Sequence, residues 1–313
     1  MTTRPRFEVI VWIGAALAAL AVLFAFGPGI ALLGTEIMIM ALFASSLNLI
    51  MSYGGMVSFG HAAYFGLGAY GFALAIVRFD VPPALALACG PLLALLAALL
   101  FGSLCVRLSH IYFAMLTLAC AEITYTILFQ AYDFTGGDTG LTRFVAPRFG
   151  LTPQFYGLVV LAVLLLSLLI LRRLVASPLG LAIRSVGEDP YRTAALGYNP
   201  RRVQLAAFVV AGGFAGLAGT LFSVLHGNAF PDYAGLAFTL DALVMVVIGG
   251  LHSFVGPIYG AVVYLLMKTF ISRYVGEWEL VVGIVLMTVV LTAPSGLAGL
   301  ASRLGMPSGG RKL

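Results

Sequence analysis

The sequence predicts an all-α polytopic membrane protein, a single domain over residues 1–313 with about 8–10 transmembrane helices, some of them broken or re-entrant. Two observations predict this class. Hydrophobic residues make up 61% of the chain and charged residues only 9%, against about 25% charged residues in a typical soluble domain. The apolar residues also gather in runs of about 20, the length that crosses a bilayer. A globular protein in water could not cover so much apolar surface, so lipid is the expected solvent.

Five apolar runs form the first part of the predicted bundle. Arg4 and Arg6 precede the first run, which is longer than the core of a signal peptide and has no clear cleavage site after it, so it is interpreted as a span. A polar stretch rich in Gly, Asp, Arg and Pro follows the fifth run and predicts an outer loop over residues 132–153. The five expected spans are Phe7–Phe26, Ile30–Ser52, Met56–Val77, Ala84–Val106 and Ile111–Ala131.

The second part begins with a sixth span, followed by residues 172–202, the most charged segment of the chain. A seventh span and three shorter apolar pieces complete the membrane part. The first two of these pieces are short for straight spans and suggest a discontinuous or re-entrant pair, which is tolerated where the backbone is buried in protein. These spans and pieces are Phe155–Leu171, Val203–Leu225, Ala237–Leu251, Phe254–Met267 and Val281–Ala293, for an expected total of ten crossings.

The distribution of basic residues predicts the orientation. If the N-terminus is inside and every segment crosses, 12 of the 17 Lys and Arg residues lie on the inner side. This excess follows the rule that cytoplasmic loops are positive. It predicts that both termini are cytoplasmic, that residues 172–202 form a cytoplasmic loop, and that residues 132–153 form a periplasmic one. The net charge of +5 does not indicate a nucleic-acid partner, because the basic residues form no stripe among aromatics.

Neither a metal site nor a disulfide framework is predicted. The three cysteines lie in or beside apolar runs without a CxxC spacing and are expected to be buried thiols. The histidines, at His61, His110, His226 and His252, are scattered and lack the spacing of a metal-binding set. No cofactor is therefore expected on this chain.

Two glycine-rich stretches are similar to each other. Residues 54–59 with Tyr64 match residues 249–254 with Tyr259 at five of eleven positions, at an offset of 195. Small and aromatic residues are common in membrane helices, so chance is one explanation. The other is an internal repeat that marks corresponding broken helices, which in transporters often line the pathway. A third group of glycines, at Gly66, Gly68, Gly212, Gly213, Gly216 and Gly219, has the spacing of tight helix packing.

A few polar residues lie within the apolar runs. Glu122 is the carboxylate at mid-depth, where a charge costs about 2.5–3.5 kcal/mol, so it should face protein or water. It either lines a pathway or is satisfied by nearby hydroxyls, at Thr117, Thr124 and Tyr125. The residues that flank Gly54-Gly55 either present polar groups to a passing solute or cross-link helices. They are Asn48, Ser58, His61 and Tyr64.

The segment 172–202 contains the signals of a short helix. Glu188 or Asp189 can cap it, Pro190 suits its first turn, and Gly197 suits its C-terminal stop. Such a helix could lie on the membrane surface or receive a soluble partner. Close approach of a partner would be allowed by its small side chains, Ala194 and Ala195, next to Leu196.

Several ordered blocks resemble a known family. The loop resembles the EAA-type coupling loop of ABC importer permeases, and the wider sequence resembles the LivM-type permeases of branched-chain amino acid transporters. The matching blocks are Leu47–His61, Tyr112–Leu118, Ile183–Phe208, Ala215–Gly219, Met245–Gly250 and Gly256-Pro257, within roughly residues 36–295. The chain departs from the family at the Pro190-Tyr191 pair and at His252, where Gly is usual, and this leaves the solute open.

This resemblance implies a permease subunit of a bacterial inner-membrane importer, not an enzyme. The implied partners are a second, LivH-like permease, two ATP-binding subunits that hold ATP and Mg²⁺, and a periplasmic solute-binding protein. The sequence itself contains no GxxxxGK[ST] motif. The implied ATPase-coupling residues are Glu188, Asp189, Arg192, Ala194, Ala195 and Gly197. The implied solute is a branched-chain amino acid; the alternatives are a permease for urea or short amides, and a proton-coupled secondary transporter.

Overall fold

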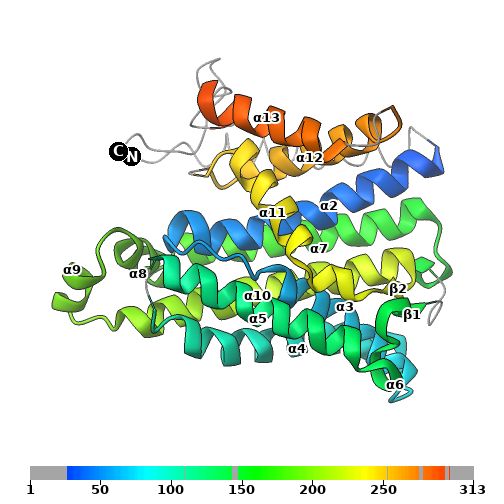
Figure 1. Cartoon of the computed structure of the whole chain (residues 1–313), viewed down its shortest axis with the longest axis horizontal. Coiled ribbons are helices and arrows are strands. Elements are labelled where there is room, and N and C mark those ends of the chain that lie inside the picture. The colour runs from blue at the N-terminus through cyan, green and yellow to red at the C-terminus, as the bar shows by residue number, and fades with distance from the viewer. Residues whose placement is uncertain are drawn as a thin grey trace.

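The computed structural model describes residues 27–108, 110–142, 147–251, 253–274 and 278–292, together with Gly296. The first expected span, Phe7–Phe26, lies outside these residues. Within the described part, five helical segments are long and apolar enough to cross a membrane. They are α2 (Pro28–Asn48) with its π-helical continuation η1 (Leu49–Tyr53), α4 (Pro83–Cys105), α5 (His110–Gln130), α7 (Pro153–Ala176) and α10 (Pro200–His226). The all-α, multi-pass membrane fold is thereby confirmed (Figure 1).

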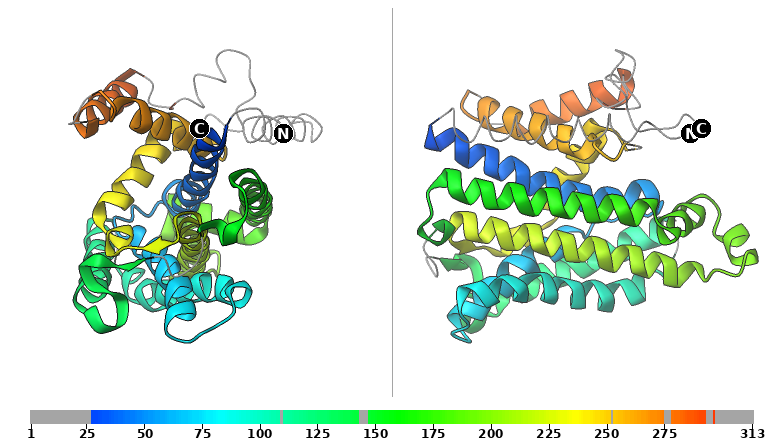
Figure 2. Two further views of the ribbon diagram at one scale, coloured as in Figure 1. Left: turned by 90° about the vertical axis from the view of Figure 1, so that its right-hand side faces the viewer. Right: turned by 180° about the vertical axis from the view of Figure 1, so that it is seen from behind.

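Shorter elements complete the described chain. Four of its shorter helices are α3 (Ala62–Val77), α11 (Leu236–Gly249), α12 (Gly256–Ile271) and α13 (Trp278–Thr292), and two more, α8 (Pro178–Glu188) and α9 (Pro190–Ala195), project beyond the bundle at one end (Figure 2). The opposite end carries α6 (Tyr132–Thr135), η2 (Gly137–Thr139), β1 (Leu141–Thr142), η3 (Pro147–Gly150), β2 (Asn228–Ala229) and η4 (Pro231–Ala234). The two strands pair antiparallel, Leu141 with Ala229 and Thr142 with Asn228.

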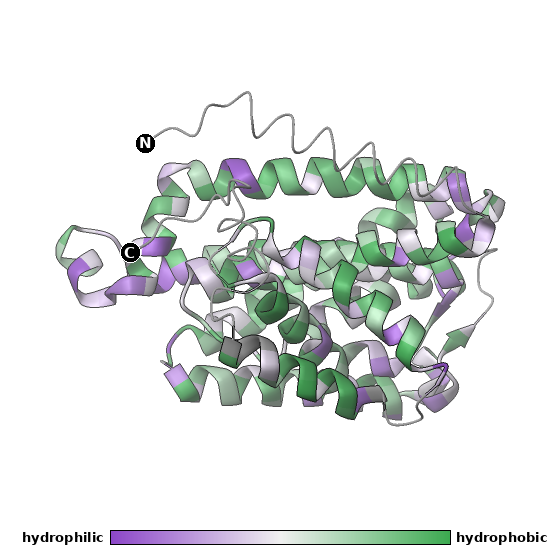
Figure 3. Ribbon diagram, turned by 90° about the horizontal axis from the view of Figure 1, so that it is seen from above, coloured by the Kyte–Doolittle hydropathy of each residue, from purple (hydrophilic) through white to green (hydrophobic). Residues whose placement is uncertain are grey.

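The hydropathy of the surface agrees with a membrane setting. The helices between the two ends are mostly apolar, and hydrophilic residues gather over α8 and α9 and over the loops at the opposite end (Figure 3). The outward faces of α4 and α7 carry large exposed apolar side chains, among them Leu96, Leu100, Leu166 and Leu169. Such faces suit contact with lipid tails.

Proline sets the start of many of these helices. Six of the described helices (α2, α4, α7, α8, α9 and α10) begin with Pro as their first residue. The first N–H groups of a helix have no partner within it, so a residue without an N–H loses nothing there, and its fixed φ suits the first turn. These prolines explain why several observed starts lie within a few residues of the predicted ones.

The predicted glycine packing is confirmed for five of the six glycines, most of them at the centre of the bundle, where α3, α4 and α10 meet. Gly213 is the exception, because a Cβ there would lie at an ordinary 3.5 Å from Leu95. A Cβ on Gly68 would overlap the backbone of Gly216, and a Cβ on Gly219 would overlap the backbone of Phe65. The helices can therefore approach this closely only where side chains are absent. The Thr220 hydroxyl donates to the Gly68 carbonyl at 3.0 Å and fastens the same crossing.

One predicted span is broken. A continuous helix over Met56–Val77 was expected, but α3 begins only at Ala62, and residues 54–61 form neither a regular helix nor a strand. Gly55 takes φ +63°, a conformation that side-chain-bearing residues avoid and that a helix cannot contain. The short pair α11 and α12 agrees with the predicted discontinuous pair: Gly250 (φ +112°) follows α11, and a Cβ on Gly249 would overlap the Gly256 carbonyl in the returning helix.

Candidate functional site at the helix breaks and the α8–α9 loop

Residues 54–61, hereafter the extended segment, lead from the end of η1 into the interior of the bundle. Gly55 and Val57 are exposed along it, while Met56, Ser58 and Gly60 are buried. Buried and exposed residues thus alternate over this part of the segment, although it is not a β-strand. The segment therefore presents part of its length at the surface of this chain and packs the rest against the helices.

Side chains of distant helices satisfy the backbone around the extended segment. The Phe59 N–H donates to Thr117 Oγ1 of α5 at 3.3 Å, and the Ala62 N–H donates to Thr239 Oγ1 of α11 at 3.0 Å. Irregular backbone at membrane depth requires such partners, because lipid provides none. Thr239 was not singled out from the sequence, and only its hydroxyl within an apolar run could have drawn attention to it.

Asn48 joins the two helix breaks. Its Nδ2 donates to the Ser253 carbonyl at 3.1 Å, and its Oδ1 accepts from the Ser52 hydroxyl in the π-helical turn. Ser253 lies in the break between α11 and α12. The two stretches that match each other in sequence thus both lie at helix breaks, and one side chain connects them.

His61 is the last residue of the extended segment and is 1% exposed. Its Nε2 lies 2.8 Å from the Ser46 hydroxyl, and its ring stacks on Phe43 with the centroids 5.5 Å apart. Its Nδ1 is buried without a hydrogen-bond partner in the described part of the chain. Tyr64, 2% exposed, follows in the first turn of α3 and packs its ring edge-to-face on Phe208.

Four of the five predicted pathway residues, all except Glu122, therefore gather around the first break, but they are closed off in this conformation. Ser58 is fully buried and accepts only a weak local bond, at 3.4 Å from the Gly60 N–H. Asn48 and His61 hold helices together through the contacts described above. These contacts are those of cross-linking residues, and a role along a solute pathway stays a prediction.

A small pocket lies beside Asn48. Ser45, one turn earlier in α2, has a buried hydroxyl without a partner among the described residues and also lines this pocket. The remaining lining residues are Leu49, Tyr53, Leu171, Val175 and Phe254. Its volume of about 10 Å³ is roughly what one water molecule needs and is far below that of a small-molecule site. Ser45 was missed from the sequence because a serine in an apolar helix is unremarkable by itself.

Glu122 lies on the exposed face of α5. The neighbouring hydroxyls of Thr117 and Thr124 do not reach it and donate to backbone carbonyls of α5 instead. The hypothesis that these two threonines satisfy Glu122 is therefore wrong. Thr126 and Gln130 are exposed on the same side, one and two turns later. A mid-depth carboxylate is costly in lipid, so this face of α5 must be covered by protein or water.

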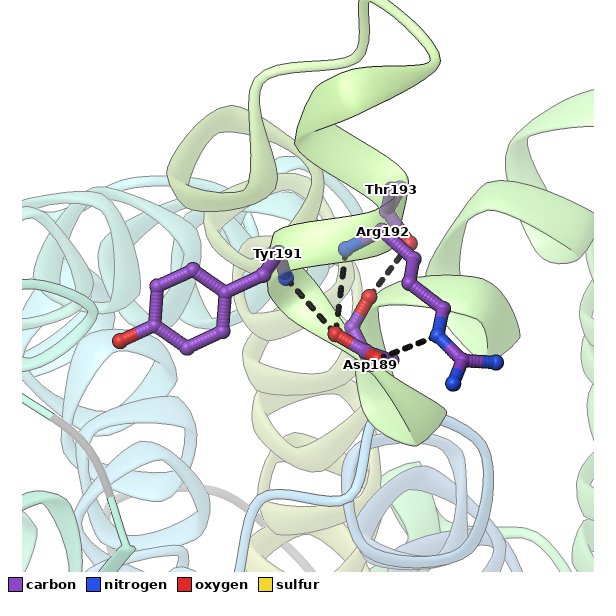
Figure 4. Close-up of polar contacts among 4 residues, drawn as sticks. All are labelled: Asp189, Tyr191, Arg192 and Thr193. Carbon is purple, nitrogen blue, oxygen red and sulfur yellow. Dashed lines mark hydrogen bonds and ion pairs between the residues drawn. The ribbon is translucent and has the colours of Figure 1, made fainter.

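The predicted short helix is confirmed as α9, and its cap is Asp189. The Asp189 carboxylate accepts from the N–H groups of Tyr191 and Arg192 at 3.0 and 3.1 Å, and it pairs with the Arg192 guanidinium at 2.9 Å (Figure 4). Glu188, the alternative cap, is instead the last residue of α8. Gly197 takes φ +90° just after α9, as expected for a C-terminal stop.

The outer side of the α8–α9 loop, residues 177–199, is open. Tyr191 is 90% exposed and Leu196 75% exposed, and the Tyr191 and Arg192 side chains point to opposite sides of α9 (Figure 4). Ala194 and Ala195 are exposed as well. These exposed apolar side chains at the end of the bundle are a candidate contact surface.

Comparison with known proteins identifies relatives. Residues 29–291 match the family described as branched-chain amino acid transport system / permease component. The chain is 29% identical over 292 residues to the high-affinity branched-chain amino acid transport system permease protein LivM of Escherichia coli, covering 85% of this chain and 69% of that protein. It is 31% identical over 125 residues to the corresponding LivH of Escherichia coli, covering 39% and 40%.

A more distant relative is archaeal. The chain is 22% identical over 174 residues to a probable branched-chain amino acid transport permease protein LivM of Methanocaldococcus jannaschii, covering 54% of this chain and 50% of that protein. No solved structure matches the chain.

Proposed function

Because the chain belongs to the family of branched-chain amino acid transport permease components, we propose that it is the membrane-spanning permease subunit of an ABC importer that carries branched-chain or related small amino acids into the cytoplasm. The observation that carries this proposal is the family match itself, which extends from the first turn of α2 to the last turn of α13. Transport would be driven by separate ATPase subunits, so the chain would not be an enzyme and would bind no cofactor of its own.

The α8–α9 loop is the proposed docking site for the ATPase subunits. Its support is the exposed apolar tip, Tyr191 and Leu196, together with a helix whose start is held by Asp189. The proposed coupling residues are those of the resemblance: Glu188, Asp189, Arg192, Ala194, Ala195 and Gly197. Glu188 would contribute from the end of α8, since it does not cap α9.

The basic residues support a cytoplasmic location for the α8–α9 end. Cationic side chains at or beyond the helix ends on this side are Arg107, Arg172, Arg173, Arg184, Arg192, Arg201 and Arg202. The loop 132–153 at the opposite end would then face the periplasm and the solute-binding protein. This orientation, in a bacterial inner membrane, is part of the proposal.

A second permease is the proposed neighbour within the membrane. LivM and LivH of Escherichia coli are both named as permease proteins of a high-affinity system for branched-chain amino acids, and this chain is similar to each. The exposed, partly polar face of α5 around Glu122 is unsuited to lipid, which supports a protein partner or an aqueous path there. Residues at the break, Asn48, Ser58, His61 and Tyr64, are proposed to line the solute path in another state of the cycle.

The test is the composition and activity of the complex that carries this chain. The chain is purified from its native membrane in mild detergent, its partners are identified by mass spectrometry, and the complex is reconstituted into vesicles. We expect one further permease, two ATPase subunits, and ATP-dependent uptake of leucine, isoleucine or valine when the binding protein is supplied.

Two other results are informative. Recovery of this chain alone, with uptake that depends on a proton gradient, would replace the proposal by a secondary transporter. ATP-dependent uptake of urea or a short amide, with no uptake of amino acids, would retain the importer and change its solute.

A further inference from the structure

At Gly187, the α8–α9 loop touches the first helix break through backbone atoms. Gly187, the second-to-last residue of α8, lies against the end of η1: a Cβ placed on it would be 2.8 Å from the Tyr53 carbonyl oxygen and 3.0 Å from the Gly54 carbonyl carbon. A Cβ placed on Gly55 would be 3.0 Å from the Gly187 carbonyl oxygen. Since backbone atoms cannot rotate out of the way as side chains do, no other residue fits at Gly187 without a shift.

A second contact lies one helical turn away. The guanidinium carbon of Arg184 is 4.8 Å from the centroid of the Tyr53 ring, within the range of a cation–π interaction. Arg184 and Gly187 are three residues apart and share one side of α8. The break is therefore held to α8 at two adjacent points, Tyr53 and Gly54-Gly55.

The far end of the extended segment is anchored as well. Its Phe59 N–H bonds to Thr117 of α5, and a Cβ on Gly60 would overlap the Thr117 carbonyl. The following Ala62 N–H bonds to Thr239 of α11. A displacement of Gly55 would thus be transmitted along the segment to the place where α3, α5 and α11 meet. At Gly60 the segment contacts α5 through backbone atoms, so part of the displacement would be transmitted without side chains.

We propose that the contact of Gly187 with Gly54 and Gly55 is the joint through which movement of the α8–α9 loop shifts the extended segment and so opens or closes the solute path. This inference rests on the proposed function. A backbone contact has no rotamers that could absorb a small movement, and tightly packed interiors transmit strain. Gly187, Gly55 and Arg184 are positioning residues in this scheme, since they act on the path through the segment.

The experiment compares Gly187→Ala with Gly213→Ala in the assembled, reconstituted complex. Both positions are helical, so the gain in helix propensity is matched. The new Cβ is crowded at position 187, whereas at position 213 its nearest neighbour is a Leu95 methyl at an ordinary 3.5 Å. The readouts are ATP hydrolysis, amino-acid uptake, and the number of solutes carried per ATP.

For Gly187→Ala we expect ATP hydrolysis at the unmodified rate. The number of solutes carried per ATP should fall by at least about fivefold, the smallest factor that is typical of coupling between two sites. Gly213→Ala should change neither. Arg184→Gln removes the second contact without adding a crowded atom and should also lower the number of solutes carried per ATP. Arg202→Gln removes a charge at the same end of the bundle and should leave that number unchanged. If Gly187→Ala fails to assemble, the Arg184→Gln result decides.

An unchanged ratio of solutes to ATP in Gly187→Ala and in Arg184→Gln would overturn the joint while leaving the importer intact. A complex without ATP-dependent uptake before any substitution would instead overturn the proposed function. The two failures are therefore separated by the unmodified complex.

Discussion

The side-chain amide of Asn48 and the carbonyl of Ser253 lie 3.1 Å apart, although 205 positions separate them in the chain. Asn48 ends α2, and Ser253 lies between α11 and α12. One hydrogen bond therefore holds together two helix breaks that belong to opposite ends of the sequence. Both residues are buried, so neither group could find water if the bond were lost.

Asn48→Asp should destabilise the complex because a carboxylate cannot donate to the Ser253 carbonyl. Leaving a buried acceptor unsatisfied costs about 1–3 kcal/mol, and we expect a lower melting temperature of the purified complex. Ser103→Ala is the control, since that hydroxyl is exposed and bonds only within its own helix. Equal melting temperatures for Asn48→Asp and the unmodified protein would show that this bond does not hold the breaks together.

Asp189→Ala should loosen the start of α9. The substitution removes two hydrogen bonds to backbone N–H groups and the pair with Arg192, and loss of such a cap costs about 0.5–2 kcal/mol. We expect less ATPase subunit to co-purify with the chain. Asp189→Asn keeps the cap without the charge and should bind the ATPase subunit as the unmodified chain does. An equal loss of ATPase subunit in both variants would show that the charge of Asp189 matters and its capping role does not.

Ala195→Trp tests the docking surface without disturbing the bundle, because Ala195 is exposed. The bulky ring should block close approach of an ATPase subunit and abolish ATP-driven uptake while the chain is still inserted at the normal level. Leu96→Trp, on the apolar outer face of α4, is the matched control. Normal uptake by Ala195→Trp would place the ATPase contact elsewhere. Gly197 is a less clear test, since its φ of +90° would strain any side-chain-bearing residue.

Glu122→Gln separates the importer from a proton-coupled transporter. The amide has about the size of the carboxyl group and still accepts a hydrogen bond, but it cannot carry a proton through a cycle. We expect ATP-dependent uptake to continue in this variant and to resist a protonophore. Uptake that Glu122→Gln abolishes, and that the protonophore also abolishes in the unmodified protein, would favour the secondary transporter.

Gly68→Ala should weaken the crossing of α3 and α10. The new methyl group would overlap the Gly216 backbone, and overpacking of this kind costs about 1–3 kcal/mol. The yield and melting temperature of the complex should both fall. Gly213→Ala, in the same helix as Gly216 but with room for a methyl group, should leave both unchanged.

The long helices could be predicted from the sequence because their length is set by the bilayer and their starts by proline. The span expected at Val203–Leu225 is observed as Pro200–His226. The cap at Asp189 was also predictable, since the chemistry of a cap lies within four residues. In both cases the information is local.

The helix breaks were only partly predictable. Gly54-Gly55 indicated a weak point, but the extended segment has its hydrogen-bond partners at Thr117 and Thr239. No local pattern points to those two residues. The same holds for Glu122: the nearby threonines seemed able to satisfy it, but each has an acceptor in its own helix, and that preference appears only in the folded chain.

The hydrogen bond from Ala62 to Thr239 has a consequence for biogenesis. The two residues are 177 positions apart, and the ribosome makes the chain from its N-terminus. While α3 and α4 enter the membrane, the acceptor for the Ala62 N–H has not yet been synthesised. The Ala62 N–H therefore cannot take its final acceptor until α11 has been made. The end of the extended segment is translated early, but its final hydrogen bonding requires a helix that is translated late.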